Sequence, residues 1–274
     1  MSHLLQLRCT LPPASGVPAY PFTVPAVRAL AELREGLSLD APVTCFVGEN
    51  GSGKSTLLEG LAAAVGLPAV GSSDVAFDPT LAPARALARH LRLGWRVHTT
   101  RGFFLRAEDF FGFAKRLTQL RAELEARAAE VREAYHAQDR SAYALGLALG
   151  PLRGSIADME RLYGADPDAR SHGESYLALL QARLAPRGLY LLDEPEAALS
   201  PQRQLALLAM LRDAVDAGSQ FVLATHSPLL LAYPGARLYS FDEAPPTAVE
   251  WDALEHVRLT RDFLAAPERF LRHL

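Results

Sequence analysis

Residues 45 to 56 decide how this chain is expected to fold, and they read Cys45-Phe46-Val47-Gly48-Glu49-Asn50-Gly51-Ser52-Gly53-Lys54-Ser55-Thr56. The run from Val43 to Val47 is short, apolar and rich in β-branched residues, as buried parallel strands are. Apolar residues then recur at helical spacing from Leu57 to Val65, until Gly66 ends the pattern. The sequence therefore predicts a strand, a glycine loop and a helix in direct succession.

This order suits a bound phosphate. A loop that turns its backbone N–H groups around an anion needs glycine where a Cβ would obstruct it. A helix that starts near Lys54 adds partial positive charge at its N-terminus. Lys54 can bridge terminal phosphates, and the Ser55 hydroxyl can ligate Mg²⁺. We therefore predict a nucleoside triphosphate site formed by Gly48, Glu49, Asn50, Gly51, Ser52, Gly53, Lys54, Ser55 and Thr56.

Composition limits the class of protein. The chain has 274 residues, of which 49% are hydrophobic and 22% charged, with a net charge of −3. Such a balance gives no clear nucleic-acid signal. The uncharged runs are too short or too interrupted to span a bilayer, and residues 1–8 lack the layout of a signal peptide. We expect a cytoplasmic protein without a transmembrane segment, with Cys9 and Cys45 buried and reduced.

A second acidic motif follows another apolar run. Residues Leu189 to Leu192 read as a buried strand that delivers Asp193 and Glu194 to its carboxyl end, where ligands sit in an open α/β sheet. Adjacent strand residues point to opposite sides, so the two carboxylates can act differently. We predict that Asp193 holds Mg²⁺ and that Glu194 aims at the attacking water. The alternative is a turn and helix cap before Pro195.

A histidine ends the next expected strand. The run Phe221 to Ala224 is apolar, and Thr225-His226-Ser227 follows it. A lone histidine is usually structural. At this edge of the sheet we predict that His226 contacts a γ-phosphate.

A second helix N-terminus is expected near residue 172. Arg170-Ser171-His172-Gly173-Glu174-Ser175 precedes an amphipathic helix. Such a start can hold a second anion, or it can simply be well capped.

The region between these motifs reads as a helical insert. Residues Glu108 to about Leu149 are rich in Ala, Leu, Glu and Arg with an apolar seam, and a further helix is expected over Ser155 to Tyr163. Near the N-terminus, Tyr20 or Phe22 can stack on an adenine ring or anchor its proline-rich loop.

These motifs, in this order, resemble the ATPase domains of the ABC type, most closely the small stand-alone bacterial ATPases described as AAA or ABC-like. The resemblance covers most of the chain. The matching motifs are Walker A at Gly48–Thr56, the signature motif at Ser171–Glu174, Walker B at Leu189–Glu194, the D-loop at Ala197–Ser200, and the switch histidine His226.

The resemblance implies an α/β P-loop fold with a mainly parallel core sheet flanked by helices. It implies one domain over 1–274, comprising an N-terminal β and phosphate-loop part (1–106), a helical subdomain carrying the signature motif (107–187), and a Walker B and switch part (188–274). It also implies Mg²⁺-dependent hydrolysis, with ATP sandwiched in a transient homodimer. Lys54, Glu194 and His226 would then be catalytic, Ser55 and Asp193 would hold the metal, and Ser171, Gly173 and Glu174 would bind the partner's nucleotide.

The sequence departs from the family pattern in several places. His172 stands where a second glycine is usual, and Glu174 stands where the family often has glutamine, although its repair branch also uses glutamate. Arg170 replaces an apolar residue, and Ser200 replaces the D-loop aspartate. A Q-loop glutamine is not evident, and the candidate segment offers Arg106 and Glu108. In transporters that loop couples to the membrane protein, so its absence weakens a transporter interpretation.

We expect a soluble ATPase that acts on an unknown protein partner. The alternatives are a transporter's nucleotide-binding subunit and a nucleotide-gated binding module without significant turnover. A DNA-repair role predicts a longer coiled coil and a basic surface, and a small-molecule kinase has no use for the signature motif or Glu194.

Overall fold

A mainly parallel sheet forms the centre of the protein. The computed structural model describes residues 2–12, 19–70, 81–163 and 172–272. The central sheet has the order β5-β6-β7-β3-β8-β9, in which only the edge strand β9 is antiparallel. Its strands are β3 (Val43–Val47), β5 (Gly102–Arg106), β6 (Leu189–Asp193), β7 (Gln220–Ala224), β8 (Arg237–Ser240) and β9 (Thr247–Val249). The sequence did not predict this order, but it placed β3, β6 and β7 correctly within a residue or two.

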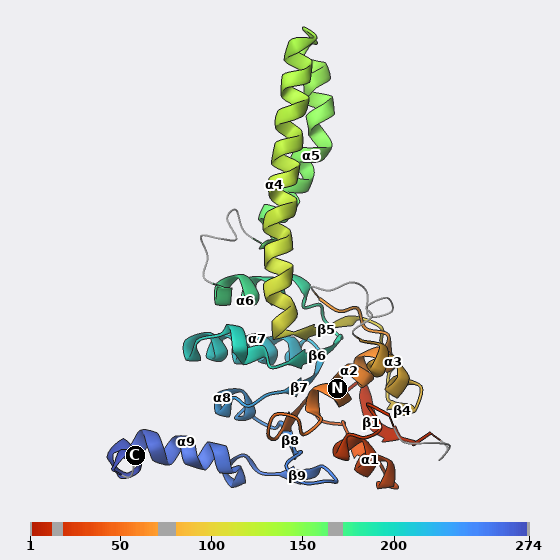
Figure 1. The fold of residues 1–274 in the computed structure, drawn as a ribbon, viewed down its shortest axis with the longest axis vertical. Coiled ribbons are helices and arrows are strands. Elements are labelled where there is room, and N and C mark those ends of the chain that lie inside the picture. The colour runs from red at the N-terminus through yellow and green to blue at the C-terminus, as the bar shows by residue number, and fades with distance from the viewer. Residues whose placement is uncertain (1, 13–18, 71–80, 164–171, 273–274) are drawn as a thin grey trace.

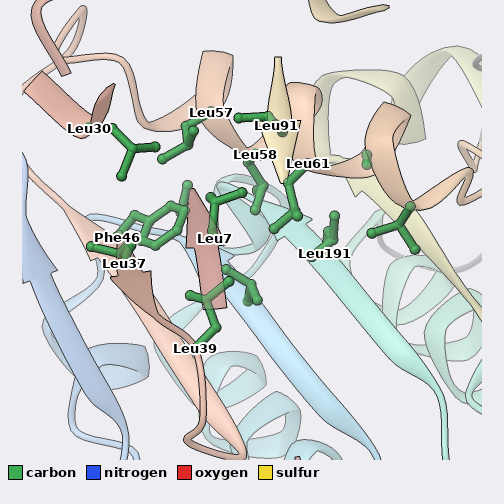
Figure 2. Close-up of a cluster of buried hydrophobic side chains, with 14 of the residues drawn as sticks. Leu7, Leu30, Leu37, Leu39, Phe46, Leu57, Leu58, Leu61, Leu91 and Leu191 are labelled. Atoms are coloured by element: carbon green, nitrogen blue, oxygen red, sulfur yellow. The ribbon is translucent and has the colours of Figure 1, made fainter. Parts of the chain in front are cut away.

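Alternation along these strands divides the core into two layers. Phe46, Leu191 and Val222 point to one face, while Cys45, Leu192 and Leu223 point to the other. The first face is covered by α1 (Pro25–Glu32), α2 (Lys54–Val65) and a small antiparallel sheet, and Figure 2 shows their leucines meeting around Phe46. That sheet has the order β2-β1-β4, with β1 at Leu4–Cys9, β2 at Leu37–Ser38 and β4 at Leu91–Trp95. The second face is covered by α6 (His172–Arg183), α7 (Pro201–Asp216), α8 (Pro228–Leu231) and the start of α9 (Glu255–Ala265).

Gln220 joins the two sheets. Its buried amide nitrogen donates to the Leu4 and Leu39 carbonyls, and its Oε1 accepts the N–H groups of His3 and Leu4, each at 2.8 Å. Because every bond reaches a segment about two hundred residues away, no local pattern could indicate it.

The helical insert has nearly the extent that the sequence indicated, but it divides into two helices at a different place (Figure 1). Helix α4 runs over Ala107–Ala137 and α5 over Ala142–Tyr163, and together they form a hairpin that projects away from the sheets. Arg121 of α4 bonds Glu160 of α5 at 2.9 Å. The sequence predicted a break between about Leu149 and Ser155, whereas in the structure the break lies at 138–141 and α5 continues through Pro151. Packing against α4 overrides the helix-breaking tendency of this proline.

The remaining elements are short. They are α3 (Ala82–Ala88), the 3₁₀ turns η2 (Pro195–Ala198) and η3 (Trp251–Ala253), and α10 (Pro267–Leu271). Within the described residues, no helix is both long and apolar enough to cross a membrane. Both cysteines are buried and free, as expected, and burial raises the pKa of the Cys45 thiol to about 12.

Candidate nucleotide site

The glycine loop adopts backbone conformations that its residues were expected to need. Gly51 and Gly53 have φ of 83° and 104°, in the left-handed region that glycine tolerates. A Cβ on Gly53 would lie 2.6 Å from the Val24 side chain, so two separate constraints require glycine there. Helix α2 begins at Lys54, directly after this residue. The sequence-based prediction of a strand, a loop and a helix is confirmed.

Lys54 lies inside the loop. Its side chain is buried, and Nζ donates to the carbonyl oxygens of Gly48 at 2.5 Å and Glu49 at 2.9 Å. Burial lowers the pKa of Lys54, while the charges of Glu194 and Asp193 oppose that change. Four negative groups therefore stabilise the ammonium at the place where phosphate oxygens would bind: Glu194, Asp193, Asp242 and Glu196.

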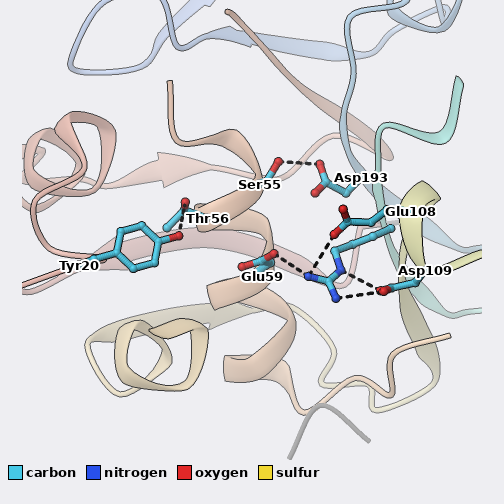
Figure 3. A network of polar contacts seen from close by, with 8 residues as sticks. Tyr20, Ser55, Thr56, Glu59, Glu108, Asp109 and Asp193 are labelled. Carbon is cyan, nitrogen blue, oxygen red and sulfur yellow. Dashed lines mark hydrogen bonds and ion pairs between the residues drawn. The ribbon is translucent and has the colours of Figure 1, made fainter. Parts of the chain in front are cut away.

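Ser55 and Asp193 come together although 138 residues separate them. The Ser55 hydroxyl donates to Asp193 Oδ1 at 3.1 Å, and Figure 3 shows the pair beside the start of α2. Burial raises the pKa of Asp193 to about 7, with Glu194 and Glu59 acting in the same direction. A hydroxyl and a buried carboxylate are the oxygen ligands that Mg²⁺ takes alongside substrate phosphates. This pair fits a magnesium ion.

The raised pKa of Asp193 predicts how the stability of the fold depends on pH. Its pKa is about 7 in the folded protein against an ordinary 3.8, so the folded state binds this proton more tightly than the unfolded chain. Ionising Asp193 therefore lowers the free energy of unfolding; this loss develops as pH rises from 3.8 to about 7 and is complete above that. We expect Asp193→Asn to raise the free energy of unfolding at pH 8 by roughly 1–3 kcal/mol without Mg²⁺. Thermal unfolding from pH 5 to 8 should show this gain shrinking as pH falls.

Asp252→Asn is the control, because Asp252 is exposed on η3. It should leave stability unchanged over the same pH range. A gain for Asp193→Asn that did not depend on pH would contradict the electrostatic explanation.

Glu194 holds a strained backbone conformation. Its φ and ψ are 49° and 47°, a left-handed geometry that is uncommon for a residue with a side chain. Its N–H donates to the Ala224 carbonyl of the neighbouring strand at 2.8 Å, which fixes the turn. Glu194 lines a cavity of about 400 Å³ together with Asn50, Gly51, Gly53, Lys54, Ser55 and Thr56.

Tyr20 lines the same cavity, and Phe22 does not. The Tyr20 hydroxyl lies 3.1 Å from Thr56 Oγ1, and the residue as a whole is 55% exposed (Figure 3). Phe22 instead packs edge-on against His90, with ring centroids 5.0 Å apart. Of the two aromatics, Tyr20 is therefore the one placed to meet a base.

His226 lies two residues past the end of β7, close to where the sequence placed it, but does not line this cavity. Its Nε2 is buried, and no described residue provides it with a hydrogen-bond partner. Burial lowers the pKa of His256, at the start of α9, and the charge of the nearby His226 lowers it further.

The expected signature segment lies only partly within the described residues. Ser171 lies outside them. Gly173 packs so tightly that a Cβ would be 2.7 Å from the Arg203 side chain and 3.0 Å from the Ala198 carbonyl. Glu174 forms an ion pair with Arg203 at 3.0 Å. No described residue of α6 lines the cavity beside Lys54.

Arg106 occupies the expected Q-loop segment at the end of β5, in register with Asp193. Its guanidinium bonds Asp109 at 2.8 and 3.1 Å and Glu59 of α2 at 3.2 Å, with Glu108 at 3.5 Å. Figure 3 shows this cluster next to the Ser55–Asp193 pair. Its charge partly offsets the effect of burial on Asp193.

Asp242 was missed by the sequence analysis. Its Oδ1 accepts the Glu49 N–H at 2.9 Å, and Oδ2 accepts the Ser240 hydroxyl at 2.8 Å. A carboxylate just past β8 thus anchors the phosphate loop. Its position after a strand was the only available signal.

Two family models match the chain in the regions that carry these motifs. One is described as an AAA domain and a candidate AbiEii toxin of a Type IV TA system, and it matches residues 165–232. The other is described as an AAA domain and matches residues 27–76. No match to a curated protein was found.

Solved structures provide further likenesses. A nucleotide-free ATP-binding cassette from an ABC transporter is 16% identical, with 95% of this chain and 96% of that chain covered and a TM-score of 0.48. The cbiO1 protein from Clostridium perfringens, part of the ABC transporter complex cbiONQ, is 14% identical over 100% of both chains, with a TM-score of 0.46. Identities and TM-scores this low say nothing about what this chain acts on. The glycine loop, the mainly parallel sheet and the AAA-domain matches over residues 27–76 and 165–232 together support an α/β P-loop fold.

Proposed function

We propose that this protein is a Mg²⁺-dependent ATPase that acts as a stand-alone cytoplasmic protein and uses hydrolysis to drive conformational work on a protein partner. One observation carries the proposal. The Ser55–Asp193 pair lies directly after the glycine loop, and Glu194 lines the same cavity as Ser55 and the loop. A metal-binding pair, a phosphate cradle and an acidic side chain thus converge on one place, as phosphoryl transfer to water requires.

The residues have separate roles in this proposal. Loop N–H groups and Lys54 bind the β- and γ-phosphates, and Glu194 orients the attacking water and accepts its proton. Ser55 and Asp193 would hold Mg²⁺, which neutralises charge on the phosphates when it is bound. Tyr20 is proposed to stack on the adenine ring.

A second copy of the chain completes the proposed site. The start of α6 packs against Ala198 and Arg203 of its own chain, beside the D-loop segment Ala197–Ser200. Because no described residue of α6 lines the cavity beside Lys54, an α6 that binds nucleotide would bind that of another copy. We therefore propose a transient homodimer in which Ser171, Gly173 and Glu174 face the partner's ATP and His226 contacts the γ-phosphate.

The test is steady-state ATP hydrolysis by the natural protein, with Mg²⁺ and with EDTA, run alongside size-exclusion chromatography in ATP. We expect turnover that depends on Mg²⁺ and a dimer that forms only with nucleotide. ATP binding without turnover would instead indicate a nucleotide-gated binding module. No binding at all would contradict the assignment of the loop.

A further inference from the structure

Glu196 bonds the main chain at His226, two residues past the end of β7. It lies in η2, two residues after Glu194. Its Oε1 accepts the His226 N–H at 2.6 Å. A hydrogen bond to an ionised carboxylate is shorter and stronger than one between neutral groups. This bond therefore fixes the backbone from which the imidazole of His226 extends.

Two neutral contacts join the same two segments. The Glu194 N–H donates to the Ala224 carbonyl, and the Ser227 hydroxyl donates to Gln204 Oε1 at 2.5 Å. The segment from Glu194 to Gln204 is therefore hydrogen-bonded to the loop after β7 on both sides of His226. Glu196 supplies the charged bond, at the histidine itself.

The other carboxylate oxygen of Glu196 is buried and, within the described residues, has no hydrogen-bond partner. The charge of Glu196 is nonetheless felt by groups on three elements: Lys54 of α2, Cys45 of β3 and Tyr176 of α6. Glu196 therefore lies close to Lys54 of the proposed phosphate site while its Oε1 holds the His226 N–H.

We propose that Glu196 is a positioning residue that holds the main chain at His226 so that the imidazole can meet the γ-phosphate of ATP. This inference rests on the proposed ATPase function. It assigns to Glu196 no contact with the nucleotide and no proton transfer. Its contribution acts through His226 and should appear in the chemical step rather than in nucleotide affinity.

The experiment compares Glu196→Ala, which removes the acceptor, with Glu196→Gln, which keeps an acceptor oxygen of the same reach. Glu268→Gln is the control, because Glu268 is an exposed carboxylate on α10. We expect Glu196→Ala to lower kcat by roughly 10- to 100-fold, as small misplacements of reacting groups do. Its KM for ATP should stay within about threefold, and Glu196→Gln should recover most of kcat. A raised KM with unchanged kcat, or no recovery by Gln, would overturn the proposal.

A second readout separates this proposal from the proposed function. The His226 amide resonance in ¹H–¹⁵N spectra reports the bond directly, and it should move strongly in Glu196→Ala and little in Glu196→Gln. ATP should shift the His226 ring resonances of the natural protein, and Glu196→Ala should abolish that shift. If the natural protein binds ATP without hydrolysing it, the proposed ATPase function is wrong. The ATP-induced shift of the His226 ring resonances still tests the role of Glu196 in that case. An unchanged ring shift in Glu196→Ala would overturn that role.

Discussion

Glu194→Gln is expected to lower steady-state ATP hydrolysis by roughly 10²- to 10⁴-fold, the usual contribution of a positioned general base. The substituted side chain keeps its size and its place on the cavity wall but can no longer accept a proton. ATP affinity should stay within a few-fold, because the loop and Lys54 carry the phosphate contacts. Phosphate release and equilibrium binding of ATP, measured on the same preparation, provide both values.

The geometry at Glu194 explains why the effect should be confined to the chemical step. The left-handed turn at Glu194 is held by its own N–H, which bonds Ala224 whichever side chain is present. Glutamine therefore leaves the backbone as it is. In size-exclusion chromatography we expect this variant to remain dimeric in ATP for much longer than the natural protein.

Glu250→Gln removes an exposed carboxylate and serves as the control. It should match the natural protein in turnover. If Glu194→Gln hydrolysed ATP at the natural rate, another group would have to activate the water, and the proposed assignment of the base would be wrong.

The predictable part of this fold is the part encoded by local pattern. Around the loop from Gly48 to Ser55, the sequence gives a strand pattern, turn-forming glycines and a helix pattern in direct succession. Asp193 was found for the same reason, since a buried strand that ends in two acids is unusual without a cation nearby. In each case neighbours in sequence determine the conformation, and parallel strands then bring their carboxyl ends to one edge.

The residues that the sequence did not reveal act at a distance along the chain. Gln220 bonds segments at the N-terminus, and Asp242 bonds the phosphate loop. Arg106 was named in the expected Q-loop segment, but its bond to Glu59 of α2 was not foreseen. None of these side chains lies in a recognisable spacing with its partner. Their partners are set by the strand order, which periodicity does not specify.

The C-terminal helix shows how a local signal can mislead. In the sequence, Thr260 stands before Arg261-Asp262-Phe263-Leu264, a pattern that predicts a helix capped by Thr260. In the structure α9 begins at Glu255, and the Thr260 hydroxyl donates to the His256 carbonyl one turn back. A threonine inside a helix can make this bond as readily as one at its cap. The contact of Val257 with the core, which fixes where the helix starts, is not visible in the sequence.

Lys54→Met is expected to reduce ATP affinity by at least about 100-fold, because it removes the charge that faces the terminal phosphates while keeping the apolar stem. The expected effect on folding is far smaller. Burial already lowers the pKa of Lys54, so its ammonium is costly to bury, and methionine removes that cost while leaving the Gly48 and Glu49 carbonyls without their donor. Titration with a fluorescent ATP analogue measures the affinity, and thermal unfolding measures the stability.

The chain offers its own matched control for this substitution. Lys115 is the only other lysine in the sequence and lies exposed on α4, so Lys115→Met makes the same chemical change outside the loop. It should bind the analogue as the natural protein does. If both variants bound equally well, the glycine loop would not be the nucleotide site, and the Ser55–Asp193 pair would need another explanation. If only Lys54→Met lost binding while its melting temperature stayed close to that of the natural protein, the loss would be electrostatic, since a folded loop without its ammonium would have failed to hold the phosphates.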